Sequence, residues 1–284
     1  DDGCKDLVLV VNNPHKDVLI ISNTHQAVNN ALNKISRRAH NATVVKIGEE
    51  LKAQELDENI ILARNYREFS NIRKNMLKTE QGHADIVGMT YHSAILQLGM
   101  KNSGFKPSLV LVDEASQMPL TQATLIGAIG CGSLIFIGDD KQMPPIYHEK
   151  LSEHPFSISI FSYLCNKFPE TKERLTITYR MNEEITNCIS RNFYETDGEK
   201  LISSALSKNR KHRIISFCED ERIKKVLGED KPIQLINVSQ EIFWEDTNEE
   251  EANFIAKLIA EAFKGGMKKE ELAEQEVEKL RIQV

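Results

Sequence analysis

Residues 109–117 read Leu-Val-Leu-Val-Asp-Glu-Ala-Ser-Gln. Four apolar residues without a polar break lead directly into two adjacent carboxylates. An uninterrupted apolar run of this length is typical of a strand in a parallel sheet that is covered on both faces. Ligands of open α/β sheets bind outside the carboxyl ends of the strands. We therefore expect Asp113 and Glu114 to lie at the ligand-binding edge of such a sheet.

Three other segments repeat this pattern of an apolar run followed by a polar turn: residues 17–21, 85–89 and 134–137. Helical spacing of apolar residues follows the first of them, and a helix is expected over residues 120–129, with Pro119 in its first turn. Alternating strands and helices predict right-handed crossovers. The fold class is therefore α/β, with doubly wound parallel sheets.

The sequence predicts two domains, at residues 1–170 and 171–284, both incomplete. Residues 50–82 are charged and helical in character, and they predict a helical excursion that contains no strand. The elements expected in the second domain are a strand at 174–178, a helix at 183–194, a strand at 233–238, a helix at 248–263 and a strand at 281–284.

The composition is that of a globular protein with a core: 40% of the 284 residues are hydrophobic and 27% are charged. No apolar run approaches the length of a membrane span. Five widely spaced cysteines form no zinc pattern and favour free thiols inside the cell. The net charge of −6 argues weakly against a nucleic-acid partner. Two basic clusters, 208–213 and 222–225, are best interpreted as solvated segments.

The adjacent carboxylates suit phosphoryl transfer. Asp113 could hold Mg²⁺ and Glu114 could orient the attacking water, although an ordinary strand end would look the same. The second motif is Gly138-Asp139-Asp140-Lys141-Gln142-Met143-Pro144-Pro145, one βαβ step later. The amide of Gln142 can donate to a terminal phosphate and accept from water. A polar surface turn is the alternative, but the spacing of the two motifs favours the nucleotide site.

These two motifs resemble motifs II and III of superfamily 1 helicases. The best match is the branch that contains the nonsense-mediated-decay RNA helicase and the replication helicase–nuclease. Residues 175–182 resemble the element that opens the second RecA-like domain of that family. The resemblance implies that Arg180 reaches the γ-phosphate, that Tyr179 packs near the adenine and that Asp139 belongs to the nucleotide site. Alternatively, Arg180 pairs with a glutamate of the following helix, Glu183 or Glu184.

Two further elements resemble family segments that touch the backbone of a single strand: residues 20–28 and 88–94. Hydroxyls and the N-terminal amides of helices suit contacts with phosphate that do not depend on sequence. Thr24 could instead only cap its helix, and Thr90 could only end its strand. The nucleic-acid-binding residues expected are Ser22, Asn23, Thr24, His25, Thr90, His92, Pro144 and Pro145.

The chain departs from the family at both ends. It contains no G-x-x-x-x-G-K-[ST] motif, so the phosphate-binding loop is missing, and the C-terminal motifs are missing too. Truncation is the simplest explanation. A chain without the loop is expected to show no ATPase activity by itself.

The parent protein is thus expected to be an ATP-dependent helicase or translocase with two RecA-like domains of the P-loop NTPase type. It would use ATP and Mg²⁺ and move 5′ to 3′ on single-stranded nucleic acid, with DNA ahead of RNA. We expect an intracellular protein, cytoplasmic or, in a eukaryote, nuclear, with no membrane partner. The alternative is a nucleic-acid-binding scaffold that has lost its ATPase activity. A P-loop ATPase that acts on a protein partner fits less well, because of the paired strand-contact elements.

Overall fold

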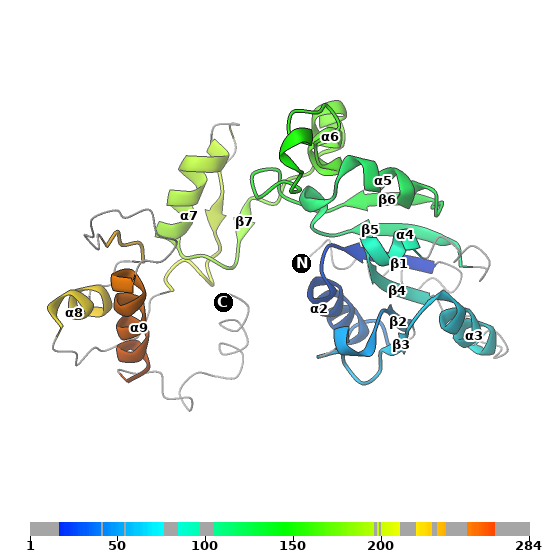
Figure 1. The fold of residues 1–284 in the computed structure, drawn as a ribbon, viewed down its shortest axis with the longest axis horizontal. Coiled ribbons are helices and arrows are strands. Elements are labelled where there is room, and N and C mark those ends of the chain that lie inside the picture. The colour runs from blue at the N-terminus through cyan, green and yellow to red at the C-terminus, as the bar shows by residue number, and fades with distance from the viewer. Residues whose placement is uncertain are drawn as a thin grey trace. The chain divides into compact units, whose positions relative to one another are not determined.

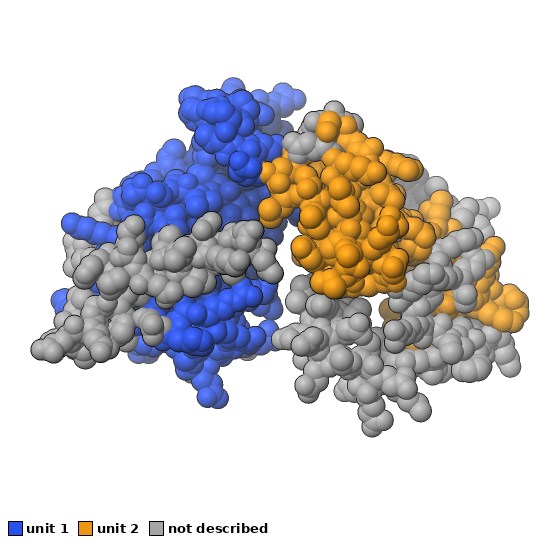
Figure 2. All heavy atoms as spheres, turned by 180° about the vertical axis from the view of Figure 1, so that it is seen from behind, with its two compact units in different colours: residues 1–173 blue, residues 174–284 orange. Residues whose placement is uncertain are grey.

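The computed structural model describes residues 17–40, 42–53, 55–76, 85–96, 105–195, 198, 200–210, 220–228, 232–236 and 249–264. The chain divides into two compact units, residues 1–173 and residues 174–284, which are coloured separately in Figure 2. The sequence placed a domain boundary near Thr171.

The first unit contains a parallel sheet of six strands in the order β3-β2-β4-β1-β5-β6 (Figure 1). Every neighbouring pair is parallel, so the predicted α/β class with a parallel sheet is confirmed. The strand bounds are Asp17–Ser22 for β1, Thr43–Ile47 for β2, Ile61–Ala63 for β3, Asp85–Thr90 for β4, Pro107–Val112 for β5 and Ser133–Phe136 for β6.

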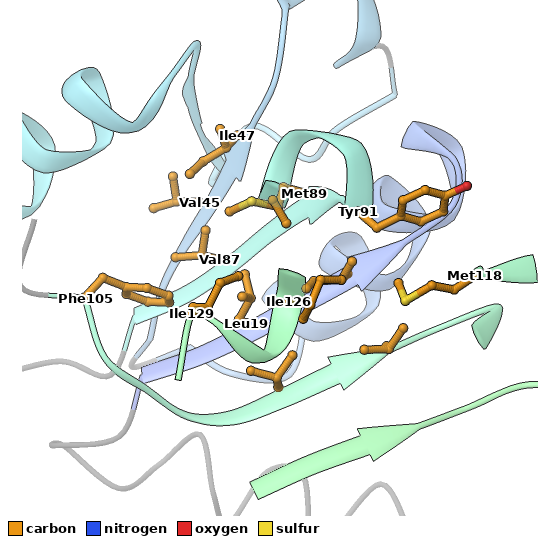
Figure 3. Close-up of a cluster of buried hydrophobic side chains, with 14 of the residues drawn as sticks. Leu19, Val45, Ile47, Val87, Met89, Tyr91, Phe105, Met118, Ile126 and Ile129 are labelled. Atoms are coloured by element: carbon orange, nitrogen blue, oxygen red, sulfur yellow. The ribbon is translucent and has the colours of Figure 1, made fainter. Parts of the chain in front are cut away.

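Helices cover both faces of this sheet. Successive strand residues point to opposite sides, so an apolar strand presents apolar side chains to both faces. Val18 and Ile20 pack with Val28 and Leu32 of α2 (His25–Ser36) on one face. The other face of the sheet belongs to a second cluster of buried side chains, part of which Figure 3 shows. This cluster also includes Phe69 and residues of three more helices. The helices of that face are α3 (Tyr66–Met76), α4 (Tyr91–Leu96), α5 (Leu120–Gly127) and α6 (Ile160–Lys167).

Residues 50–82 are not a purely helical excursion, and the expectation that they contain no strand is wrong. They hold a short 3₁₀ turn (Glu50–Lys52), the strand β3 and the helix α3. β3 pairs with β2 and so belongs to the main sheet. Its three residues are too few to show a periodic pattern within a charged segment, which is why the sequence did not reveal it.

β6 differs from the other apolar strands because its side chains remain exposed. Leu134 and Ile135 expose 39% and 48% of their surface. Among the described residues β6 pairs only with β5, and it therefore forms an edge of the sheet. The apolar run correctly predicted the strand, but its burial depends on neighbours that the local sequence does not contain.

The described part of the second unit contains two short parallel strands, β7 (Ile177–Thr178) and β8 (Ile202–Ser203). Its helices are α7 (Glu183–Ile189), which continues as a π-helical turn over Ser190–Tyr194, α8 (Glu221–Gly228) and α9 (Glu249–Lys264). The strand predicted at 174–178 is thus shorter, and residues 233–236 form no strand, contrary to prediction. Residues 237–238 and 281–284 lie outside the described part. No helix in the described ranges is long and apolar enough to cross a bilayer.

A buried ion pair joins the start of β1 to α3. A guanidinium nitrogen of Arg73 lies 2.8 Å from the Asp17 carboxylate, and both side chains are nearly buried. The same carboxylate accepts a hydrogen bond from the backbone amide of Lys106, and Arg73 lies over the ring of Phe105. The pair therefore ties together β1, α3 and the segment that enters β5.

Replacing Arg73 by methionine should destabilise the first unit by about 3–5 kcal/mol, because it leaves the Asp17 carboxylate buried without its cation. Urea unfolding of the wild type and the variant measures this loss. Arg67→Met, an exposed change on the same helix, should stay within about 0.5 kcal/mol of the wild type. Adding Asp17→Asn to Arg73→Met should recover part of the loss, and no recovery would contradict the ion-pair explanation.

Candidate nucleotide site and strand-contact turns

The turns that follow β4, β1, β5 and β6 lie at one edge of the sheet, because these neighbouring strands are parallel. Backbone hydrogen bonds join three of these turns. The amide of Asp113 donates to the carbonyl of Ile21 at 2.7 Å, and the amide of Ala115 donates to that of Ile137 at 2.8 Å. The structure thus brings the acidic pair next to the ends of β1 and β6.

The two residues of the acidic pair differ in their position and backbone conformation. Asp113 directly follows β5 and is half-buried. Its carboxylate accepts no hydrogen bond from any described residue. Glu114 adopts a left-handed conformation, with φ of 53°, before the 3₁₀ turn Ala115–Gln117. This conformation is uncommon for a residue with a side chain and costs on the order of 1–3 kcal/mol. Strain of this kind is concentrated at functional sites.

The loop after β6 comes close to the acidic turn. A Cβ atom on Gly138 would lie 2.9 Å from the backbone nitrogen of Ser116, so only glycine allows this approach. Beyond it, the side-chain amide of Gln142 donates to the carboxylate of Asp139 at 2.9 Å. The amide of Lys141 donates to the other oxygen of Asp139 at 3.0 Å. Asp139 therefore organises the loop, while Gln142 is exposed and its amide oxygen can accept a further bond.

The end of β1, the turn after it and the start of α2 contain four of the predicted strand-contact residues. Thr24 is exposed and caps α2, because its hydroxyl oxygen accepts from the amide of Ala27 at 3.2 Å. The hydroxyl hydrogen of Thr24 can still donate to a ligand. The Asn23 side chain donates to Gln117 at 2.5 Å. Ser22 is buried, and its hydroxyl has no hydrogen-bond partner among the described residues.

His25 is the first residue of α2 and is partly buried. Burial lowers the pKa of its imidazole below 6.5, and the neighbouring Lys46 and Lys52 lower it further, while Glu49 opposes the shift. The neutral imidazole is thus the form favoured near neutral pH. A phosphate contact by His25 would therefore be a hydrogen bond of a neutral ring.

The remaining predicted contacts differ in exposure. Thr90 is buried and caps α4, with its hydroxyl 3.0 Å from that of Ser93. His92 is exposed, and its ring stacks on Tyr91 with centroids 4.5 Å apart. Pro144 is exposed whereas Pro145 is buried. Thr90 is the last residue of β4, as the alternative interpretation expected, and its hydroxyl also has a structural role in capping α4.

Tyr179 and Arg180 lie in the second unit, and both side chains are exposed. Glu183 pairs with Lys208 at 3.1 Å. The Arg180 guanidinium forms no ion pair within the described ranges, so the pairing of Arg180 with Glu183 or Glu184 is not observed. The carbonyl of Arg180 accepts a hydrogen bond from Arg210. This hydrogen bond fixes the backbone of Arg180 and does not involve its guanidinium.

Sequence reasoning missed Gln117 and Lys46. Gln117 belongs to the quoted stretch 109–117, but its bond to Asn23 joins residues 94 positions apart. Lys46 is completely buried beneath α2. The only signal of it is a charged residue inside the short apolar run 43–47.

The described residues contain no group of three or more His, Cys, Asp or Glu side chains that could cage a metal. The Asp113 carboxylate, which accepts no hydrogen bond from a described residue, fits Mg²⁺, because this ion is commonly held by one or two carboxylates together with substrate phosphates and waters.

Comparison with known proteins relates the chain to two family models and to several helicases. An AAA domain family model matches residues 7–148, and a second AAA domain model matches residues 156–278. The chain is 30% identical over 205 residues to a DNA replication ATP-dependent helicase/nuclease of Schizosaccharomyces pombe, covering 70% of this chain and 14% of that protein.

Two other relatives are also helicases. An uncharacterized ATP-dependent helicase of Methanocaldococcus jannaschii is 27% identical over 189 residues, covering 66% of this chain and 27% of that protein. The probable helicase senataxin of Homo sapiens is 28% identical over 161 residues, covering 49% of this chain and 6% of that protein. The chain therefore spans less than a third of the length of these relatives. Since the first family match covers half of its residues, the chain belongs to the AAA-domain family and, within it, to the superfamily 1 helicases.

Proposed function

We propose that this chain is part of an ATP-driven translocase that moves on single-stranded nucleic acid. The observation that carries the proposal is the double attachment of the acidic turn. The amide of Ala115 donates a hydrogen bond to the carbonyl of Ile137, directly after β6, and the side chain of Gln117 accepts one from Asn23 in the turn after β1. A change at the acidic pair can thus be transmitted to the turn that would touch the strand.

On the nucleotide side, Asp113 would hold Mg²⁺, and Glu114 would orient the attacking water and accept its proton. Bound ATP with Mg²⁺ supplies the phosphoryl group and neutralises its charge. Gln142 would contact the terminal phosphate, with its side chain held by Asp139. The resemblance to the family implies that Arg180 would contact the terminal phosphate and that Tyr179 would pack near the adenine.

On the strand side, Thr24, His25 and the exposed His92 and Pro144 are the residues best placed to meet a ligand. Asn23 and the buried Ser22, Thr90 and Pro145 would support these contacts from behind. We propose movement from 5′ to 3′, with DNA ahead of RNA as the track, inside the cell in the cytoplasm or nucleus. A scaffold that binds nucleic acid without hydrolysing ATP is the second candidate, and a full-length protein that lacks a phosphate-binding loop would favour it.

The strand contact can be tested at Thr24. Aspartate and asparagine both cap helices well, so Thr24→Asp and Thr24→Asn should both preserve α2. Only aspartate adds a negative charge that repels phosphate. We expect Thr24→Asp to weaken binding of a mixed-sequence single strand by about tenfold, or ~1.4 kcal/mol, and Thr24→Asn to bind nearly as the wild type does.

Fluorescence anisotropy of a labelled oligonucleotide measures both variants, and circular dichroism checks that the helix is retained. Binding by the wild type should fall as salt rises and depend little on sequence, as phosphate contacts do. Equal affinities of Thr24→Asp and Thr24→Asn would show that this turn does not meet phosphate. Tight binding of duplex with a base preference would argue against a single-strand track.

A further inference from the structure

Lys46 is a fully buried lysine of the first unit, with 0% of its surface exposed. It lies on β2, where Val45 and Ile47 belong to the core on the α3 side and Val44 belongs to the core beneath α2. Because strand residues alternate between the two faces, Lys46 also points beneath α2. A cation thus occupies a position at which the pattern of the strand calls for an apolar side chain.

The ammonium group of Lys46 is bonded to the first turns of α2. Its nitrogen donates to the side-chain oxygen of Asn29 at 2.7 Å and lies 3.4 Å from the carbonyl oxygen of His25. Asn29 in turn donates to the carbonyl of Lys52 at 3.1 Å. Lys46 therefore connects the beginning of α2 both to β2 and to the segment that follows β2.

Two glycines show how closely α2 lies on the sheet at this point. A Cβ atom on Gly88, the partner of Lys46 on β4, would lie 2.7 Å from the side chain of Leu32. A Cβ atom on Gly48 would touch the ring of His25 at 3.4 Å. The first turn of α2 is thus closely seated, and the lysine contact is made inside this packed region.

Without a bound anion, the positive charge of Lys46 lowers the stability of the fold. Burial lowers the pKa of its ammonium to about 8. A cation beneath the N-terminus of a helix also meets the positive end of the helix dipole. A methionine of similar length would avoid both costs in a protein that needed only packing there. The same charge is favourable when an anion binds at that helix terminus.

We infer that Lys46 is a positioning residue for strand binding: its ammonium holds the Thr24–His25 turn in place and adds positive potential where a strand phosphate would bind. This inference rests on the proposed function, in which that turn meets the strand. Lys46 itself touches no ligand, since it is completely buried.

The charge of Lys46 gives strand binding and folding opposite pH dependences. Above about pH 8 the ammonium loses its proton, and strand affinity should fall. The unfolded chain keeps an ordinary lysine, so between the folded and unfolded pKa values the unfolded state binds more protons and the contribution of Lys46 to stability rises with pH. If Lys46 had only a structural role, raising the pH would not weaken strand binding while it stabilises the fold.

In the described part of the chain, few other titratable groups lie near Lys46. His25 on α2 interacts electrostatically with Lys46, and His25 in turn interacts with Glu49 and Lys52 in the segment after β2. The pKa of His25 is lowered from 6.5, so its titration lies below the window from pH 7 to 9. The neighbours of Lys46 on β3 and β4 are Leu62 and Gly88, which do not titrate.

The test measures the affinity of the whole chain for a labelled mixed-sequence single strand between pH 7 and 9, at constant ionic strength. The wild type should lose about three- to tenfold in affinity over this range, the size of one partly buried charge interaction at a helix terminus. Lys46→Met should be weaker by the same factor at pH 7 and nearly independent of pH. Lys34→Met removes the same charge from the exposed far end of α2 and should keep the wild-type profile.

A second variant keeps the inference testable if Lys46→Met does not fold. Asn29→Asp places a carboxylate beside the ammonium and should raise the pKa of Lys46, so the fall in affinity should move to higher pH. An unshifted profile in Asn29→Asp, or a wild-type profile in Lys46→Met, would overturn the role of Lys46 while the proposed function stands. A wild type that binds no single strand at any pH would overturn the proposed function itself, and this role with it.

Discussion

Replacing Glu114 by glutamine in the full-length protein is expected to lower ATP turnover by about 10²–10⁴-fold, the usual scale for removing a group that handles a proton. Binding of ATP should persist, because glutamine has nearly the same size and Asp113 remains to hold Mg²⁺. Asp113→Ala should instead weaken the Mg²⁺-dependent binding of ATP. Phosphate release and titration with a fluorescent nucleotide separate the two effects.

The chain offers a closely matched control for this change. Glu55 is the other described residue besides Glu114 that has a side chain and a positive φ, at 67°, and it is exposed on the surface. Glu55→Gln therefore repeats the same chemical change on the same kind of backbone and should leave turnover unaffected. Normal turnover in Glu114→Gln would refute the assignment. A full-length protein that contains a phosphate-binding loop and still hydrolyses no ATP would favour the scaffold.

Arg180→Ala is expected to slow hydrolysis by about 10³-fold or more, the scale of an arginine that stabilises the transferring phosphoryl group. Affinity for ADP should change little, because ADP lacks the terminal phosphate. Arg180→Lys should restore only part of the rate, since lysine cannot donate two parallel hydrogen bonds to phosphate oxygens.

Binding of ADP and of a non-hydrolysable ATP analogue, measured with the turnover rate, distinguishes this role from a structural one. Arg191→Ala removes an exposed arginine of the same unit and should leave all three quantities near the wild type. If Arg180→Ala loses ADP and analogue binding equally, Arg180 supports the fold of the second unit instead.

The parallel sheet and the position of its reactive edge could be predicted because the information is local. Residues 17–21, 85–89, 109–112 and 134–137 each carry an uninterrupted apolar run followed by a polar turn, and each run forms a strand of the main sheet. Parallel strands end at a common edge by geometry alone. The proximity of Asp113 to the ends of β1 and β6 follows from that pattern.

The errors in predicting strands concern segments that form a strand only if a neighbouring strand pairs with them. β2 carries Lys46 within a short apolar run, and β3 has three residues, so both are recognisable only from their pairing with the rest of the sheet. Residues 233–236 have the composition of a strand but do not form one. A strand is stable only when its backbone groups pair with a neighbour, and that pairing is not encoded within the segment itself.

The sequence by itself determined the class of fold, the edge at which its turns meet and the types of residue in those turns. Only the tertiary structure decided which side chains are available: Thr90 caps α4, Asp139 holds Gln142, and Asn23 is bonded to Gln117. It also placed the ammonium of Lys46 beneath the first turn of α2. Hydrogen bonds between residues far apart in the chain depend on how helices and strands pack, and no local pattern of residues specifies that packing.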